Sequence, residues 1–166
     1  MKKIFLLSTL YFLLSTFVMG CGYVTHSTLP PGLKVAVPML KNSTYHTGVE
    51  IKITRALIKK FTTEGTAVTN IENADFLLSA ELINYDKEPL RWVHGIEKEV
   101  EEYRLTLTAN VTYKDLRNNE IIWEERINGD TDYFIVGSKK KDEENALEEA
   151  VKDLAENIIN RICEEW

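Results

Sequence analysis

The sequence predicts an α+β fold in which two helices pack on one face of a four-stranded mixed sheet. Residues 103–113 alternate strictly between apolar and polar side chains, which is typical of a strand with one buried and one solvated face. Residues 49–64 and 142–162 repeat apolar side chains every three or four positions, as amphipathic helices do. The order along the chain is strand, helix, three strands and helix, so two helices are available to cover one face of the sheet.

The four expected strands differ in how clearly the sequence marks them. The first, residues 33–37, is short and ends at Pro38, which cannot donate to a sheet ladder and therefore suits an edge. The second spans residues 74–85, and the third is the alternating segment. The fourth begins at Ile121 and continues or restarts through residues 132–136.

The buried face of the predicted sheet is expected to meet both helices through apolar side chains. Spacing places Leu107 of the third strand and Leu154 of the second helix in this core, whereas Thr106 and Thr108 fall on the opposite, solvated face. Ile51 and Ile58, seven positions apart, lie outside the main apolar stripe of the first helix. The favoured interpretation is a wide buried stripe, and the alternative is a second contact surface.

Capping residues mark both helices. Gly65 follows the first helix and is suited to the left-handed conformation that often ends one. Asp142 precedes the second helix as its N-cap, and Glu143 and Glu144 in the first turn complement the helix dipole.

The first 20 residues have the features of a secretory signal peptide. Lys2 and Lys3 give a positive start, and residues 4–19 carry no charge but are shorter than the roughly 20 apolar residues of a membrane-spanning helix. Residues 18–20 (Val-Met-Gly) precede Cys21 and resemble the lipobox of bacterial lipoproteins, in which an aliphatic, a variable and a small residue precede the lipid-bearing cysteine. We expect cleavage after residue 20 and attachment of fatty acids such as palmitate to Cys21.

Lipid attachment would leave a mature chain of two parts. Residues 21–32 are the lipidated N-terminus and a polar tether that ends in Pro-Pro-Gly, and residues 33–166 form a single α+β domain. The residue after the cysteine is Gly22 rather than Asp, and by resemblance to the common lipoprotein sorting rule this indicates the outer membrane. The alternative is a plain secreted protein with Cys21 in a disulfide to Cys163.

Charge and motif content exclude several classes of function. Removing Lys2 and Lys3 leaves 18 of the 20 basic residues against 26 acidic ones, a formal charge of −8, whereas a nucleic-acid-binding domain shows a basic surface. The chain has no glycine-rich phosphate loop, no G-x-S-x-G and no C-x-x-C or H-E-x-x-H pattern. Its histidines, His26, His46 and His94, lack ligand spacing. The sequence therefore predicts no enzymatic activity, no metal site, no cofactor and no nucleic-acid partner.

Several motifs in a fixed order resemble one protein family. The lipobox and "CGY" at 21–23 are followed by "VAVPMLKNSTYHTGVEIKITRALIKKFTTEG" at 35–65, "EEYRLTLTANVTY" at 101–113 and the closing helix. The most specific positions are Val37-Pro38, Asn42, Thr44, Gly48-Val49-Glu50, Ile53-Thr54 and the "EYRL" of the third strand. Their order after a lipobox is similar to that of the LptE family of lipopolysaccharide-assembly lipoproteins.

This resemblance implies both a fold and a function. Members of the family have two helices on a four-stranded sheet and sit as a plug inside a large outer-membrane β-barrel, the LptD protein. Together the two proteins move lipopolysaccharide from the periplasm to the outer leaflet. The resemblance therefore implies three associations for this chain: an LptD-like barrel, lipopolysaccharide, and the outer membrane through the lipid anchor.

A lipopolysaccharide-binding protein needs cations for phosphate close to apolar surface for acyl chains. Two expected loops, residues 86–95 and 137–142, combine these features. The candidate binding residues are Lys87, Arg91 and Trp92 in the first loop and Lys139, Lys140 and Lys141 in the second. The alternative for each loop is ordinary solvated surface. Leu90, Trp92, Val93 and Ile96 are unusually apolar for a free loop, so they either fold back on the domain or touch the barrel wall.

Two rival functions remain open from the sequence. The first is a periplasm-facing lipoprotein that serves as an accessory subunit of another envelope assembly or secretion machine. The second is a carrier of lipid or glycan that acts without a barrel. Co-purification separates them, because a plug is extracted together with one large barrel and a carrier is extracted alone.

Overall fold

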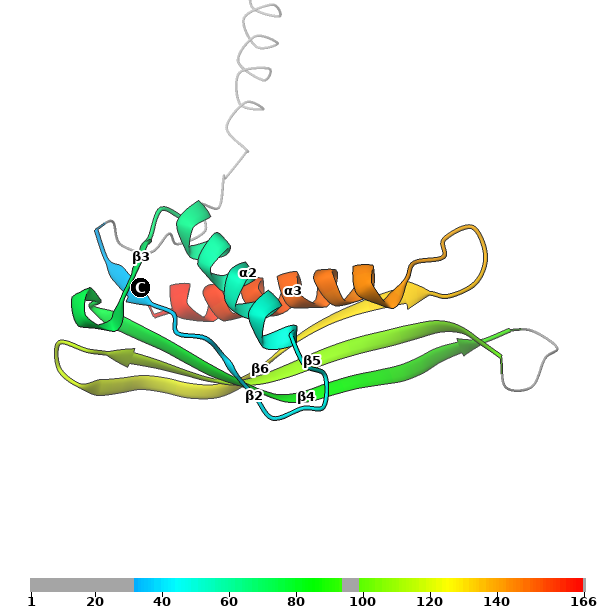
Figure 1. Ribbon diagram of the computed structural model, residues 1–166, viewed down its shortest axis with the longest axis horizontal. Helices are drawn as coiled ribbons and strands as arrows, with labels where there is room; N and C mark the ends of the chain where they lie inside the picture. Colours follow the sequence, from blue (N-terminus) through cyan, green and yellow to red (C-terminus); the bar gives the residue numbers. More distant parts are fainter. Residues whose placement is uncertain (1–31, 94–98, 166) are drawn as a thin grey trace, which may run out of the picture.

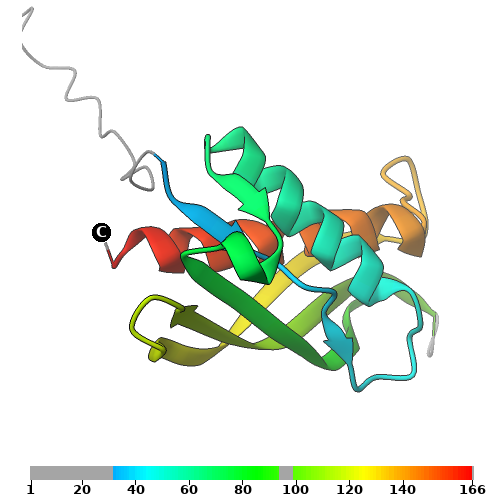
Figure 2. The same cartoon turned by 60° about the vertical axis from the view of Figure 1, so that its left-hand side comes forward.

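A computed structural model of the chain describes residues 32–93 and 99–165, and in it two helices lie on one face of a long, twisted sheet (Figure 1). The turned view in Figure 2 again places both helices on the same side of the sheet. In chain order the elements are β1 (Lys34–Ala36), β2 (Lys41–Asn42), α2 (Val49–Thr63), β3 (Ala67–Thr69), the 3-10 turn η2 (Ile71–Asn73), β4 (Phe76–Trp92), β5 (Val100–Asp115), β6 (Glu120–Phe134) and α3 (Glu143–Cys163). Neither α2 nor α3, the two α-helices of the described part of the chain, is both long and apolar enough to span a membrane.

The sheet has six strands, two more than the sequence predicted. Their order is β3-β1-β4-β5-β6, and β2 pairs with β4 further along that strand. β1 runs parallel to both of its neighbours, whereas β4, β5 and β6 form an antiparallel meander, so the sheet is mixed as predicted. The strands missing from the prediction, β2 and β3, are two and three residues long. Such short segments cannot display the alternation by which a strand is recognised.

The second expected strand is longer than predicted, which changes the setting of three candidate residues. β4 continues to Trp92 and β5 begins at Val100, so Lys87, Arg91 and Trp92 lie on a strand and the prediction of a loop at these positions is wrong. Pro89 and its charged neighbours gave the segment the composition of a loop. The strand accommodates them with register shifts on either side of Arg91.

The far ends of β4 and β5 project beyond the helices. Figure 1 shows these two strands continuing past the start of α3, where no helix covers them. A strand with water on both faces has no need to alternate apolar and polar residues. For this reason the sequence of this part of β4 did not predict a strand.

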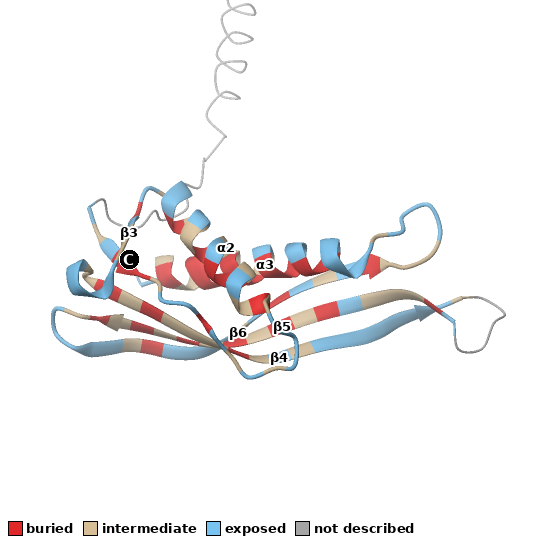
Figure 3. Cartoon of the chain, in the orientation of Figure 1, coloured by how far each residue is buried: buried red, intermediate tan, exposed pale blue. Residues whose placement is uncertain are grey.

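The core confirms the predicted faces. Leu107 on β5 and Leu154 on α3 are completely buried, and Figure 3 shows buried positions along the sides of the helices that are turned towards the sheet. Thr106 and Thr108, on the opposite face, are half-buried. Ile51 is 37% exposed, so the favoured interpretation of a wide buried stripe on α2 is wrong at this position. The stripe of α2 follows residues four apart, and Ile51 falls between them.

Both predicted helix ends are present. Gly65 follows α2 with a φ of 81°, and the N–H of the next residue, Thr66, donates to the carbonyl of Phe61 at 2.9 Å. At the start of α3, Asp142 Oδ1 accepts a hydrogen bond from the backbone N–H of Asn145 at 2.8 Å. This cap marks the end of the loop 137–142, which carries the three consecutive lysines.

Candidate functional site

Two of the predicted basic residues meet around one aromatic ring at the end of β6. The guanidinium carbon of Arg91 lies 5.7 Å from the ring centroid of Phe134, and Lys139 Nζ lies 6.0 Å from the same centroid. Arg91 comes from β4 and Lys139 from the loop before α3, so the fold joins segments that are 48 positions apart. Cations over an aromatic face are attracted by the negative face of the ring. We call Arg91, Phe134 and Lys139 the Phe134 cluster.

Backbone contacts hold the lysine loop against the end of β6. The N–H of Lys141 donates to the carbonyl of Phe134 at 2.8 Å, and Lys140 forms a single parallel bridge with Phe134. The loop turns at Gly137, which has a φ of 81°, a conformation that glycine adopts most easily. The folded-back loop therefore places Lys139 beside the ring and leaves Lys140 exposed next to it.

Lys87 points to α3 instead of the Phe134 cluster. Its Nζ lies 2.7 Å from Glu143 Oε2 and 4.5 Å from the centroid of the Tyr103 ring. Glu143 also accepts a hydrogen bond from the Tyr85 hydroxyl at 3.0 Å. The hydrogen bond from the Lys87 ammonium holds the pKa of Glu143 below its ordinary value, against the opposing effect of burial. Lys87 therefore ties the long strand β4 to the first turn of α3.

Lys141 is also paired within the domain. Its Nζ lies 2.6 Å from both carboxylate oxygens of Glu149, which further accepts a hydrogen bond from Thr131 at 3.0 Å. These bonds lower the pKa of Glu149. In contrast, neither Lys139 nor Lys140 has a carboxylate within 4.0 Å in the described part of the chain. The three consecutive lysines thus divide into one that fastens the loop and two that remain open to an anion.

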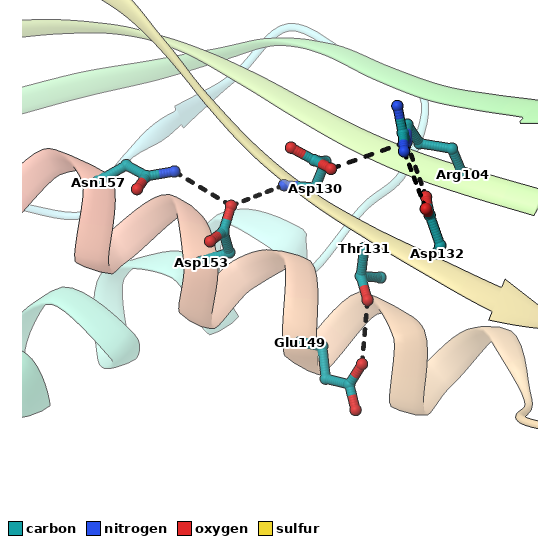
Figure 4. Close-up of polar contacts among 7 residues, drawn as sticks. All are labelled: Arg104, Asp130, Thr131, Asp132, Glu149, Asp153 and Asn157. Atoms are coloured by element: carbon teal, nitrogen blue, oxygen red, sulfur yellow. Dashed lines mark hydrogen bonds and ion pairs between the residues drawn. The ribbon is translucent and has the colours of Figure 1, made fainter.

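A further cation near this end of the sheet is neutralised by β6. Arg104 Nε and Nη2 donate to the two carboxylate oxygens of Asp132 at 2.7 and 2.9 Å, and Asp130 Oδ2 lies 3.8 Å away (Figure 4). On the other side of β6, the N–H of Asp130 donates to Asp153 of α3 at 3.0 Å. Arg104 therefore contributes to the packing of the strands and is not open to an anion as Lys139 is.

Two apolar side chains that flank Arg91 in β4 are exposed. Leu90 is 40% exposed and Trp92 is 50% exposed, so neither folds back over the domain. Ile96, which the sequence grouped with them, lies outside the described residues, as does the predicted lipid-bearing Cys21. Arg91 Nη2 lies 3.4 Å from Glu102 Oε2, but the arginine side chain is still 58% exposed. The arrangement thus offers two open lysines and one exposed, partly neutralised arginine, together with exposed apolar side chains, the combination that an amphiphilic anion requires.

The sequence predicted no metal site, and it did not identify Phe134 as a candidate binding residue. Within residues 32–93 and 99–165, no group of three or more His, Cys, Asp or Glu side chains is arranged to hold a metal ion. Phe134 received no role from the sequence, because only the pairing of β4, β5 and β6 brings Arg91 to it. Its position five residues before Lys139 was the one available hint.

Comparison with known proteins identifies the family. The sequence profile of the LptE family, described as lipopolysaccharide-assembly, matches residues 33–162. The chain belongs to the LptE family. The match covers all six strands, α2 and α3 up to residue 162, so the resemblance seen in the sequence motifs is confirmed over residues 33–162. A comparison with the curated proteins found no match to this chain.

Solved structures share the fold of this LptE-family chain at low sequence identity. An uncharacterized lipoprotein B from Nitrosomonas europaea is 16% identical, with a TM-score of 0.59 over 87% of this chain and 91% of that one. The rare lipoprotein B from Shewanella oneidensis is 15% identical, with a TM-score of 0.56 over 80% and 95% of the two chains. A PelC dodecamer from Paraburkholderia phytofirmans is 16% identical, with a TM-score of 0.50 over 82% and 94%. These similarities establish the fold and give no information about a ligand.

Proposed function

We propose that this LptE-family protein is an outer-membrane lipoprotein that binds lipopolysaccharide and assists an LptD-like β-barrel in placing it in the outer leaflet. The family match over residues 33–162 carries the proposal. The role is one of binding and assembly, without catalysis.

The proposed anchor is Cys21. One acyl chain gives only marginal binding to a membrane, whereas two or more give stable anchoring. Residues 22–32 would then act as a tether, spanning about 35 Å when extended. Such a tether keeps the domain within reach of an outer-membrane partner without burying it in the bilayer.

The proposed lipopolysaccharide site is the Phe134 cluster together with Lys140 and Trp92. Arg91, Lys139 and Lys140 supply positive charge for phosphate, while the exposed Trp92 supplies apolar surface for an acyl chain or a sugar face. Charge-assisted hydrogen bonds contribute about 1.5–3 kcal/mol each, and salt screens those that stay exposed. Lys87 and Lys141 take part indirectly, because their ion pairs with α3 position β4 and the lysine loop.

The proposed contact with the barrel uses the face of the sheet that the helices leave uncovered. Thr106 and Thr108 of β5 lie on this face, and Asn110 Nδ2 donates to Glu124 Oε1 there at 3.1 Å. Hydroxyl, amide and carboxylate groups tolerate a wet environment, as the lumen of a large barrel provides. A plug of this kind needs a rigid core and a polar outer surface, and the domain has both.

Co-purification tests the partnership. The lipidated protein extracted in mild detergent should come out with one large β-barrel, identified by mass spectrometry. Replacing Thr106 and Thr108 together by Arg should remove the barrel from the extract, because two bulky charges would stand on the contact face. The matched control is Thr62→Arg with Asn160→Arg, which adds two bulky charges at exposed positions of α2 and α3, away from this face. Extraction of the wild-type protein without any barrel would contradict the plug and favour a carrier or another envelope machine.

A further inference from the structure

A groove between α2 and α3 adjoins the Phe134 cluster and shares Lys139 and Lys140 with the proposed lipopolysaccharide site. Its volume is about 820 Å³, and its walls are α2 from Ala56 to Thr63, α3 from Asn145 to Glu156, and the lysine loop. Two buried side chains of α3, Val151 and Ala155, and the half-buried Ala56 of α2 form an apolar floor. Cavities of this size accommodate ligands or short peptide segments.

The groove is locally cationic in an acidic protein. The whole chain carries a formal charge of −6, but the groove is lined by six lysines against four carboxylates. The lysines are Lys59, Lys60, Lys139, Lys140, Lys141 and Lys152. Lys60 pairs with Glu64 at 3.3 Å and Glu156 at 3.8 Å, whereas Lys59 has no carboxylate within 4.0 Å in the described ranges. On the α3 wall, Lys152 Nζ lies 3.9 Å from Glu156 Oε1, but the lysine side chain is 76% exposed. An unpaired lysine on α2 and a weakly paired, exposed lysine on α3 can therefore meet a negatively charged partner.

Ion pairs between α2 and α3 show the relative direction of the two helices that form the groove. Lys52 pairs with Glu144 and Glu148, and Lys60 pairs with Glu156, so the two helices run the same way along the groove. From Asn145 to Glu156 the α3 wall is roughly 17 Å long at 1.5 Å per residue. That length matches about five residues of extended chain. The small side chains of the floor allow a backbone to approach closely.

The lining favours carboxylates carried on a peptide over phosphate. Among the described residues, no arginine lines the groove, so it lacks the planar bidentate donor that phosphate sites often use. The exposed carboxylate of Glu148 can accept a backbone N–H group of an extended peptide, as groove binding commonly requires. Alternating negative and small apolar side chains would meet the lysines and the floor in turn.

We propose that this groove docks an extended acidic segment of a protein partner, with carboxylates on Lys59 and Lys152 and small apolar side chains on the floor. The proposal does not depend on lipopolysaccharide binding at the Phe134 cluster. Lys59 and Lys152 are exposed and lie outside that cluster, so variants at these two positions separate the two sites.

The test uses a fluorescein-labelled peptide of alternating Glu and Val residues, followed by fluorescence polarisation on the mature domain at two salt concentrations. The double variant Lys59→Glu/Lys152→Glu should bind the peptide at least about tenfold more weakly, since two attractive contacts become repulsive. The matched control, Arg55→Glu/Lys114→Glu, makes the same charge change outside the groove and should keep wild-type affinity. Circular dichroism confirms that each variant is folded.

Three outcomes would overturn the proposal. They are unchanged peptide affinity in the folded Lys59→Glu/Lys152→Glu variant, an equal loss in the control pair, and displacement of the peptide by inorganic pyrophosphate at similar concentrations. The first two mean that no docking occurs in the groove, and the third means that the groove is a phosphate site.

Lipopolysaccharide binding is measured on the same variants and should be unchanged. Its failure in the wild-type protein would contradict the proposed function while leaving the peptide result intact.

Discussion

Gly129 of β6 lies directly against Leu154 of α3. A Cβ atom added at Gly129 would stand 2.2 Å from the backbone nitrogen of Leu154 and 2.4 Å from its Cβ. Gly129 also pairs across the sheet with the completely buried Leu107 of β5, so this close contact of helix and strand lies within the core. Only a residue without a side chain leaves room for the helix at this distance.

Gly129→Ala should therefore be strongly destabilising, although it adds only one methyl group. The added methyl group must push α3 away from β6, which loosens packing on Leu154 and lengthens the bond from Asn157 Nδ2 to the carbonyl of Asn128, now 2.9 Å. Overpacking of this kind costs about 1–3 kcal/mol, and occasionally more. Urea unfolding followed by circular dichroism measures it. Arg126→Ala is the control, because Arg126 is an exposed residue of the same strand; a cost at Gly129 no greater than at Arg126 would contradict the close approach.

Burial separates the two faces of β5. Leu107→Ala and Leu154→Ala each remove a completely buried side chain and should each cost about 2–5 kcal/mol of unfolding free energy. Thr106→Ala and Thr108→Ala, on the uncovered face, should cost less than about 1 kcal/mol in the isolated domain. Denaturant unfolding of the four variants is the measurement. Threonine variants as costly as the leucine variants would mean that both faces of the sheet are covered.

Asp115 should make stability depend on acid pH. Arg117 Nη2 lies 2.6 Å from Asp115 Oδ2, and this hydrogen-bonded pair lowers the pKa of the almost buried carboxyl group. The unfolded chain then binds a proton at a higher pH than the folded one. The stabilisation is therefore fully present above the ordinary Asp pKa of about 3.9 and is lost as the pH falls through the lowered folded-state value.

Asp115→Asn removes this linkage. The variant should be less stable than the wild type at neutral pH, and the difference should shrink as the pH falls below the ordinary Asp pKa. Thermal unfolding at a series of pH values measures it. Asp86→Asn serves as the control, because Asp86 is exposed and should leave the pH profile as it is. Parallel profiles for wild type and Asp115→Asn would show that the ion pair has no energetic role.

Cys21→Ala should abolish lipid attachment. Under the proposed processing, the charged start, the uncharged segment 4–19 and the small residue Gly20 would direct cleavage and lipid attachment to this cysteine, and without its thiol no thioether can form. Metabolic labelling with a radioactive fatty acid should mark the wild-type protein and leave the variant, which stays an unprocessed precursor, without label. Label retained on the variant would disprove attachment at Cys21. Cys163→Ala is the control and should be labelled as the wild type is.

Local pattern was enough to predict most of the fold. The four-residue spacing of α2 and the alternation around Leu107 predicted which faces are buried, because in both cases burial follows a simple period. The two extra strands and the continuation of β4 to Trp92 could not be predicted in this way. β2 and β3 are too short to show a period, and the far part of β4 is wet on both faces.

The candidate site depends on contacts that no local pattern contains. The sequence marked both basic segments but gave no reason to join them, and it counted Lys87 and Lys141 with the others although each is held by a carboxylate of α3. Pairing between β4, β5 and β6 brings Arg91 to Phe134, and the loop turn at Gly137 brings Lys139 there. Lys residues of one run can thus have different roles, which only the tertiary structure separates.

The central claim is that the Phe134 cluster and Lys140 bind lipopolysaccharide, and charge reversal tests it most directly. Titration of purified lipopolysaccharide into the mature domain would compare wild type, the triple variant Arg91→Glu/Lys139→Glu/Lys140→Glu and the control Lys34→Glu/Lys41→Glu/Lys114→Glu, at two salt concentrations and with circular dichroism as the folding control. The triple variant should bind at least about tenfold more weakly, with a smaller salt dependence, and the control should bind as the wild type does. Unchanged affinity in a folded triple variant would contradict the account and place the ligand site elsewhere on the domain or on the barrel.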